Sequence, residues 1–223
     1  MVVPRSILFG PDNKDHFEGF KYHDVWSTDF ERRVLQNFVF MRRGDAEHNP
    51  EFKQPIAYCM IMNPKTNKIF AFQRAKKDQN YFEKRLQGKW SWGVGGHIDK
   101  VDSEGSVEDA ASEVSKMSAS GANPIHTSML RELKEEIGLS EIAGFKKVGY
   151  INLENTSVDQ VHFGILYVVE THSEIIAPAD AEMDNGMLRT LEELEMIHAS
   201  PDYTLEGWSE ITVDPLRTLM RTG

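Results

Sequence analysis

The chain has 223 residues, of which 40% are hydrophobic and 27% are charged, and its formal net charge is -10. This composition fits one large soluble domain, or one domain with an extension, that can bury a substantial core. The negative charge argues against broad electrostatic binding to a nucleic-acid polymer or to an anionic membrane. It leaves room for a small anionic substrate held through a cation.

Cysteine usage and hydropathy indicate the compartment. Cys59 is the one cysteine of the sequence, which excludes an intrachain disulfide and fits a reducing compartment. The first ten residues have no long apolar stretch after a basic start, and apolar runs such as "FGILYVVE" are too short to span a bilayer. We therefore expect a soluble, cytoplasmic protein.

The first third of the chain predicts a helix followed by a buried hairpin. The helix is indicated by apolar residues at helical spacing, namely Phe30, Val34, Leu35 and Phe38. Ser27 or Thr28 is its expected N-cap. Residues 48–55 predict a loop. Residues 56–63 then predict a buried strand, joined by a turn to a second strand over 69–74.

The middle of the chain is polar and rich in small residues. A polar connection leads to the short strand "WSWGVGG", which ends in glycines. Beyond it, Ser106 followed by Asp109 forms a capping box that predicts a short helix over 107–117. A Ser/Gly-rich loop is expected to follow.

The clearest predicted helix comes next. Asn123 is a good N-cap, Pro124 suits the first helical position, and Gly138 is placed to end the helix after Ile137. Two strands follow, 145–154 and 161–171. A helix is then expected to begin near Thr190, and a last turn or helix to cover 214–220. Strands interspersed with helices predict an α/β or α+β domain.

The helix over 124–137 has an apolar and an acidic side at 100° per residue. The apolar side comprises Leu130, Leu133 and Ile137, flanked by His126 and Met129. The opposite side comprises three acids, Glu132, Glu135 and Glu136. Like charges at this spacing repel by about 0.2–0.5 kcal/mol per pair. The cluster is therefore either a solvated face with ion pairs, such as Arg131 with Glu135, or a site for a hard cation such as Mg²⁺.

A wider pattern bears on this choice. The stretch "RELKEEIGL", residues 131–139, matches R-E-[apolar]-x-E-E-x-G-[apolar] at every position, and "WSWGVGGHID" lies upstream. Over about residues 55–200 the chain resembles the Nudix hydrolases (MutT-like phosphohydrolases), whose box has this core. The resemblance implies an α/β/α sandwich with a mixed β-sheet over 51–223, including a short C-terminal tail. Residues 1–50 would be an extension packed on this domain, and about 100–122 an insertion.

The resemblance also implies roles for the acids. Glu135 and Glu136 would bind Mg²⁺ or Mn²⁺, with Glu132 as a further ligand or an orienting group. Arg131 would hold a glutamate in place through a charge-assisted hydrogen bond. The carbonyl of Gly95 would reach the metal.

Substrate contacts are predicted at five positions, four of them with a simpler alternative. Gly95 and Gly96 would let the backbone approach phosphate closely, or they form a plain turn. His97 follows them directly. Arg74 would face the substrate, or it is a solvated arginine at a strand end. Arg85 would contact phosphate, or it belongs to a solvated basic loop.

Further residues are candidates for the general base and for stacking on a nucleobase. A later loop of the family often supplies a general base, for which Glu182 and Asp184 are the candidates here, although both are equally ordinary loop acids. Aromatic residues would either stack on a base or pack in the core. These are Tyr81, Phe82, Trp90, Trp92 and Phe163.

The sequence departs from the family in two places. Thirty-five positions separate Gly96 from Arg131, about twenty-one more than the usual box has. The usual glutamate eight residues before the arginine is replaced by Asn123, a poor metal ligand for which Asp99 or Glu104 is a candidate substitute.

Together these features predict a hydrolase of a phosphoanhydride, such as a nucleoside diphosphate linked to another group. The protein would act on a small molecule, with a homodimer as the family's suggestion. One alternative is a non-catalytic Nudix-like binding or regulatory module. A further one is an enzyme like isopentenyl diphosphate isomerase, in which a catalytic cysteine stands where this chain has Gly95.

Overall fold

The computed structural model describes residues 1–75, 86–104, 123–179 and 181–222. The helix predicted over 107–117 and the side chains of Tyr81, Phe82 and Arg85 lie outside these residues. The chain divides into two compact units. The first comprises Met1–Tyr58, Gly95–Leu130 and Lys147–Tyr167, and the second comprises Cys59–Val94, Arg131–Lys146 and Val168–Gly223.

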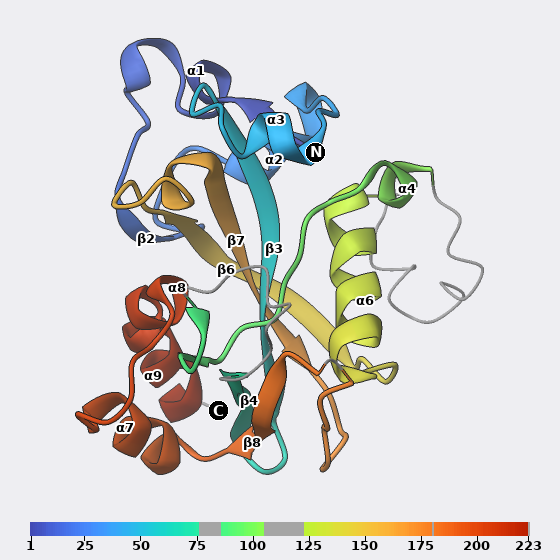
Figure 1. The fold of residues 1–223 in the computed structure, drawn as a ribbon, viewed down its shortest axis with the longest axis vertical. Helices are drawn as coiled ribbons and strands as arrows, with labels where there is room; N and C mark the ends of the chain where they lie inside the picture. Colours follow the sequence, from blue (N-terminus) through green and yellow to red (C-terminus); the bar gives the residue numbers. More distant parts are fainter. Residues whose placement is uncertain (76–85, 105–122, 180, 223) are drawn as a thin grey trace. The chain divides into compact units, whose positions relative to one another are not determined.

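Within the described residues, strands and helices form the α+β architecture with a mixed sheet that the sequence predicts (Figure 1). The strands are β1 (Val3–Pro4), β2 (Gly19–Tyr22), β3 (Phe52–Asn63), β4 (Lys68–Arg74), β5 (Trp90–Ser91), β6 (Gly144–Asn152), β7 (His162–Glu170) and β8 (Met183–Arg189). Hydrogen bonding orders them β2-β6-β7-β3-β4-β5, with β1 paired to β3 and β8 to β4.

The helices are α1 (Arg5–Leu8), α2 (Phe30–Asn37), α3 (Arg43–Ala46), α4 (Lys100–Ser103), α6 (Pro124–Ile137), α7 (Leu191–Ala199), α8 (Gly207–Ile211) and α9 (Val213–Thr222). Two 3-10 turns, η1 (Pro11–Asn13) and η3 (Asp159–Val161), accompany them. None of the helices in the described part of the chain combines the length and apolarity that a bilayer crossing requires.

In the first unit, the predicted helix near residue 30 is α2. Its cap is Asp29, whose Oδ1 accepts the backbone N–H of Arg32 at 3.2 Å, one position after the expected Thr28. Phe30 is fully buried, and its ring centroid lies 5.6 Å from those of Phe17 and Phe163. Aromatic side chains of the N-terminal fifty residues therefore contribute to the core of this unit.

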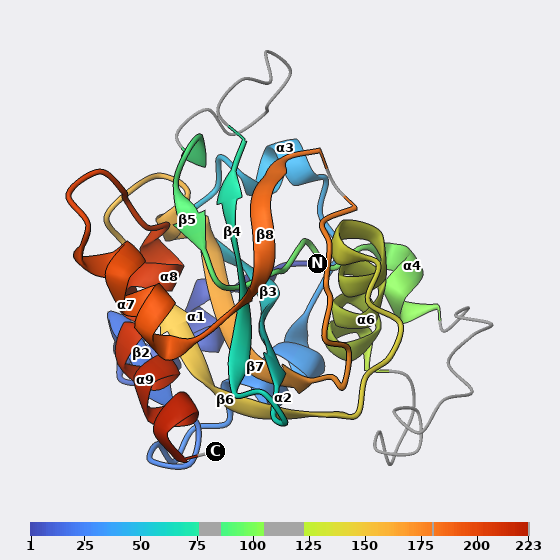
Figure 2. The same cartoon turned by 90° about the horizontal axis from the view of Figure 1, so that it is seen from below.

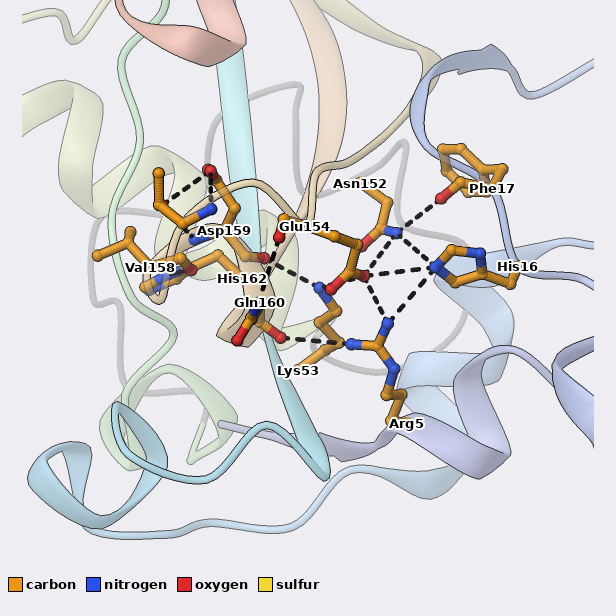
Figure 3. A network of polar contacts seen from close by, with 11 residues as sticks. Arg5, His16, Phe17, Lys53, Asn152, Glu154, Val158, Asp159, Gln160 and His162 are labelled. Carbon is orange, nitrogen blue, oxygen red and sulfur yellow. Dashed lines mark hydrogen bonds and ion pairs between the residues drawn. The ribbon is translucent and has the colours of Figure 1, made fainter.

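A buried ion network also ties the N-terminal residues to β3 and to the end of β6 (Figure 3). Glu154 Oε1 accepts hydrogen bonds from Arg5 Nη2 at 2.6 Å, Lys53 Nζ at 3.0 Å and Asn152 Nδ2 at 3.0 Å. The Lys53 side chain is fully buried, and this burial lowers its pKa to about 8 despite Glu154. Burial alone would raise the pKa of Glu154, but Arg5 and Lys53 lower it to about 2. The network thus compensates a buried ammonium with a carboxylate.

The network explains one error of the sequence prediction. A loop is expected over 48–55, but β3 already begins at Phe52. Polar Lys53 and a following proline argue against a strand. Pairing of Lys53 with Val3 of β1 and the bond of its ammonium to Glu154 override that local signal.

In the second unit, β4 pairs with both β5 and β8, which flank it in Figure 2. The hairpin of β3 and β4 and the helices α7 and α9 confirm the sequence predictions for these segments. Strand β8 was not expected, because Asn185–Gly186 is a typical turn signal. Asn185 instead adopts φ 55° at a register shift within the β4–β8 pair.

Candidate functional site

Both predicted ends of α6 are confirmed. The Asn123 Oδ1 accepts the backbone N–H of Ile125 at 2.9 Å. Gly138 follows the last helical residue with φ 62°, and the N–H of Leu139 donates to the carbonyl of Leu133 at 3.1 Å. This six-to-one bond is the Schellman arrangement, in which glycine supplies the left-handed residue.

The buried and exposed sides of α6 differ in part from the sides that the sequence predicts. Its buried stripe comprises Ile125, Met129, Leu133 and Ile137. Leu130, expected in the core, is half-buried. Glu135 is exposed as expected, but Glu132 and Glu136 are half-buried. Successive four-residue steps advance the stripe by about 40° each, so it passes beside Glu136 instead of opposite to it.

Two of the three acids share one arginine. Arg131 Nη1 donates to Glu132 Oε1 at 2.7 Å and to Glu135 Oε2 at 3.2 Å. Burial, followed by the charges of Glu136 and Glu132, raises the pKa of the Cys59 thiol. These two carboxylates therefore act on a buried group of β3.

The segment before β8 lies against this turn of the helix. The N–H of Ala179 donates to the carbonyl of Glu136 at 2.8 Å. Glu182, the candidate base, is half-buried, and its carbonyl accepts the N–H of Ala75 at 2.9 Å. Asp184 lies within β8 opposite Gln73 and is exposed, so it is not in a loop as the sequence suggests. The role of Glu182 as a general base stays a prediction.

At the N-terminal end of α6, the residue that replaces the usual glutamate has an acid beside it. Asn123 Nδ2 donates to Glu31 Oε1 at 3.3 Å. The same carboxylate contacts His126 Nε2 at 3.2 Å, Lys147 Nζ at 2.8 Å and Tyr167 Oη at 2.7 Å. Burial alone would raise the pKa of Glu31, but these hydrogen bonds and the charge of Lys147 lower it to about 2.

The two acids named as substitutes, Asp99 and Glu104, have other partners. Asp99 is the N-cap of α4, and its backbone N–H donates to Asp102 Oδ2 at 2.8 Å. Glu104 is exposed and lies 3.8 Å from Lys100 Nζ. The acid that contacts Asn123 thus comes from α2, more than ninety residues earlier. No spacing rule in the sequence points to Glu31.

The glycines and His97 belong to the first unit. A Cβ on Gly95 would lie 2.3 Å from the carbonyl oxygen of Ala57, so this close approach requires glycine. His162 Nδ1 donates to the Val158 carbonyl at 2.8 Å. Its Nε2 therefore accepts from His97 Nε2 at 3.1 Å when both rings are neutral. Burial, then the charges of Arg43 and His162, lowers the pKa of His97 to about 3.

The remaining candidates are an arginine and the aromatic residues. Arg74 Nε donates to Glu206 Oε1 at 2.6 Å, and the guanidinium lies 4.9 Å from the Phe72 ring centroid. Its contact with substrate stays a prediction, as does that of Arg85. The described aromatic candidates are buried, as the core alternative predicts: Trp90, Trp92 and Phe163.

The donor set fits Mg²⁺ in kind. Its carboxylate oxygens are the ligands that this ion prefers, and Mg²⁺ usually needs one or two carboxylates, completed by water and substrate phosphate. Among the described residues, no three acids, histidines or cysteines are grouped so that they could hold a metal ion. That Glu132, Glu135 and Glu136 would hold the ion, together with water and substrate, stays a prediction.

Fold and acid-bearing helix together define a member of the Nudix superfamily, and the chain belongs to it. The structure is similar to that of Tm1382, which is assigned to the Nudix hydrolases, with a TM-score of 0.72 and 25% identity. That match covers 98% of this chain and 97% of Tm1382. The fold is also that of a Nudix hydrolase from Alicyclobacillus acidocaldarius, with a TM-score of 0.54 and 14% identity over 76% of this chain and 91% of that one.

At the level of sequence, the chain is 30% identical over 220 residues to protein YmaB of Bacillus subtilis (strain 168). The alignment covers 97% of this chain and 96% of YmaB, so it includes the N-terminal fifty residues. No family model matches the sequence.

The isomerase alternative lacks its nucleophile. Gly95 stands where that enzyme has a cysteine, and the sequence has no cysteine besides Cys59. Cys59 is buried and its thiol pKa is raised. A thiol in this environment stays protonated and is a poor nucleophile.

Proposed function

We propose that the protein is a divalent-metal-dependent hydrolase of a phosphoanhydride, with nucleoside diphosphates linked to another group as its substrate class. The supporting observation is that Arg131 bonds both half-buried Glu132 and exposed Glu135, with half-buried Glu136 next to Glu135 in the chain. A bound Mg²⁺ or Mn²⁺ would neutralise the diphosphate and lower the pKa of water. Membership of the Nudix superfamily agrees with this activity.

In this proposal the chain's own residues position charge and move a proton. Arg131 holds Glu132 and Glu135 in fixed orientations through its two hydrogen bonds. Water attacks one phosphorus in line, the bridging P–O bond breaks, and the leaving phosphate keeps the electron pair. Glu182 takes the proton of the attacking water. Arg74 stabilises charge on the substrate.

The test is a panel of nucleoside diphosphate derivatives incubated with and without Mg²⁺. Product phosphomonoesters are detected by adding phosphatase and measuring phosphate. We expect turnover with Mg²⁺, and its loss both in chelator and in the Glu136→Gln variant. Saturable binding of the same compounds without turnover would instead support the binding-module alternative.

A further inference from the structure

The last helices of the second unit are attached to strand β5, and one residue at this attachment contacts β4. The Trp90 N–H donates to the Thr204 carbonyl at 2.8 Å, and the Glu206 N–H donates to the Trp90 carbonyl at 2.9 Å. Leu205 forms a parallel bridge with Trp90 between these two bonds. Glu206 is the N-cap of α8, but its side chain makes no capping hydrogen bond. Its carboxylate instead contacts Arg74 at the end of β4.

The contact between these two residues is a largely buried ion pair. Arg74 Nε donates to Glu206 Oε1 at 2.6 Å, and the two side chains are 18% and 10% exposed. The guanidinium also lies 4.9 Å from the ring centroid of Phe72, which is two residues earlier and therefore on the same face of β4. The carboxylate and the ring together hold the guanidinium in one orientation within the fold.

Stability alone does not account for this ion pair. A buried ion pair stabilises a fold little more than apolar residues of the same volume do, because desolvation offsets the attraction between the charges. Helix α8 also has neutral attachments to the same strand. Ser209 Oγ accepts the Trp92 N–H at 3.2 Å, and Trp92 Nε1 donates to Thr212 Oγ1 at 3.3 Å. Beyond these attachments, the ion pair provides a fixed direction for one arginine.

Arg74 lies beside the segment that contacts the acid-bearing helix. The next residue, Ala75, donates its N–H to the Glu182 carbonyl at 2.9 Å, and Ala179 donates its N–H to the Glu136 carbonyl at 2.8 Å. Three residue steps separate Ala179 from Glu182, which is at most about 11 Å of chain. Arg74 and the acids of α6 are therefore connected to opposite ends of one segment, which is short enough for one substrate to contact both.

We propose that Glu206 is a positioning residue that orients Arg74 toward a phosphate of the substrate. This inference rests on the proposed function, in which Arg74 stabilises charge on the substrate. A carboxylate held at Nε fixes the plane of the guanidinium, and the edge formed by Nη1 and Nη2 then faces away from Glu206. That edge matches phosphate oxygens with two parallel hydrogen bonds. An arginine that is oriented in advance loses less conformational entropy on binding.

Orientation of Arg74 and competition for Arg74 predict opposite results for Glu206→Ala. If the carboxylate orients the guanidinium, its removal weakens the binding of a phosphate ligand. If the carboxylate competes with phosphate for the guanidinium, its removal strengthens that binding, because the neutralising charge is lost. Glu206→Gln keeps an oxygen that can accept the Arg74 Nε–H, so it should rescue the orientation that Glu206→Ala loses.

The test measures the binding of inorganic pyrophosphate with Mg²⁺ to the full chain by isothermal titration calorimetry. We expect Glu206→Ala to weaken binding by between about tenfold and a hundredfold, because a misplaced guanidinium loses its contacts. Glu206→Gln should bind within about twofold of the wild type, since the hydrogen bond to Arg74 is kept. For each panel compound that is hydrolysed, KM should rise in Glu206→Ala while kcat changes little, as expected for a contact made equally in the ground and transition states.

A matched control separates positioning from attachment of the helix. Ser209→Ala removes a neutral bond between α8 and Trp92 and leaves Arg74 and Glu206 in place. It should lower the unfolding temperature, as Glu206→Ala does, and leave the affinity for pyrophosphate unchanged. Circular dichroism establishes that each variant is folded. If Glu206→Ala does not fold, Glu206→Leu keeps most of the side-chain volume without an acceptor and provides the same measurement.

The outcomes distinguish this inference from the proposed function. Equal affinity of the wild type and Glu206→Ala for pyrophosphate, including no measurable binding by either, would overturn the positioning role. Tighter binding by Glu206→Ala, or an equal loss in Ser209→Ala, would overturn it as well. Hydrolysis of panel compounds with the same KM in the wild type and Glu206→Ala would overturn this inference and leave the proposed activity. Pyrophosphate binding that depends on Glu206, without hydrolysis of any panel compound, would overturn the proposed activity alone.

Discussion

At the start of α6, donors from four residues bind the single carboxylate of Glu31, whereas near its end Arg131 contacts two of three neighbouring carboxylates. The Glu31 side chain is 12% exposed, while the Glu135 side chain is 61% exposed. An acid whose hydrogen bonds are made within the fold stabilises the fold. Crowded acids that share one arginine are candidates for binding something outside the chain. The contrast sets a structural carboxylate of α2 against the proposed functional carboxylates of α6.

The largest expected effect is on catalysis. Glu136→Gln keeps the size of the side chain and removes its charge, so we expect turnover with Mg²⁺ to fall by orders of magnitude while the fold remains intact. Glu135→Gln should act in the same direction. Steady-state kinetics with circular dichroism measures both. Near-normal activity in both variants would remove the metal-site assignment.

The next effect is on stability and concerns the other end of α6. Glu31→Gln removes the buried carboxylate partner of Lys147 and leaves it only the more exposed Asp29. We expect a loss of about 3 kcal/mol in the free energy of unfolding. Urea denaturation measures it. Glu135→Gln is the matched control from the exposed face, with an expected change within about 0.5 kcal/mol. Equal losses of unfolding free energy in the two variants would contradict the distinction between the carboxylates at the two ends of α6.

The same acid predicts a pH dependence. The pKa of Glu31 is about 2 in the folded protein against an ordinary value of 4.5. Its stabilising contribution is therefore complete above pH 4.5 and is lost as the pH falls toward 2. We expect the stability difference between the wild type and Glu31→Gln to shrink across this window. A constant difference from pH 7 to pH 3 would contradict the low pKa.

A smaller effect is expected from Asn123→Asp. Aspartate caps a helix as well as asparagine does, but it removes the donor to Glu31 and adds a like charge beside it. We expect a loss of about 1.5 kcal/mol in unfolding free energy. The loss should largely disappear in the Glu31→Gln background, because the two residues interact directly. Additive effects in the double variant would argue against that contact.

The smallest expected effect is at the C-terminal cap. Gly138→Ala forces a side chain into a left-handed conformation, at φ 62°, which costs about 1 kcal/mol. Gly144→Ala is the control, since no atom lies within 4 Å of the added methyl and its φ is ordinary. Thermal unfolding of both variants provides the comparison. A loss as large in Gly144→Ala would remove the assignment to backbone strain.

Local signals predicted much of this molecule. Caps at Asn123 and Gly138 fixed the bounds of α6, and the motif "RELKEEIGL" pointed to the family that the comparisons support. These signals depend on residues close together in the chain. Burial was less predictable. The buried side of α6 extends toward Glu136, and only the packing of the folded chain shows how far.

Long-range contacts were not predictable from one sequence. Glu31 reaches Asn123 across more than ninety residues, and Lys53 becomes a strand residue because Val3 and Glu154 meet it. Strand β8 carries a turn signal at Asn185 that its pairing with β4 overrides. In each case a distant partner decides the outcome, and no period or spacing in the sequence encodes that partner.

The contact between Glu31 and Asn123 also constrains how the two positions can change over evolution. An acid at position 123, as the usual box has, would face a second acid across a hydrogen-bond distance. A protein with this fold can therefore carry an acid at one of the two positions and needs a neutral or donating residue at the other. We expect the pair to covary among homologues, with an N-terminal carboxylate accompanying each loss of the acid from the box.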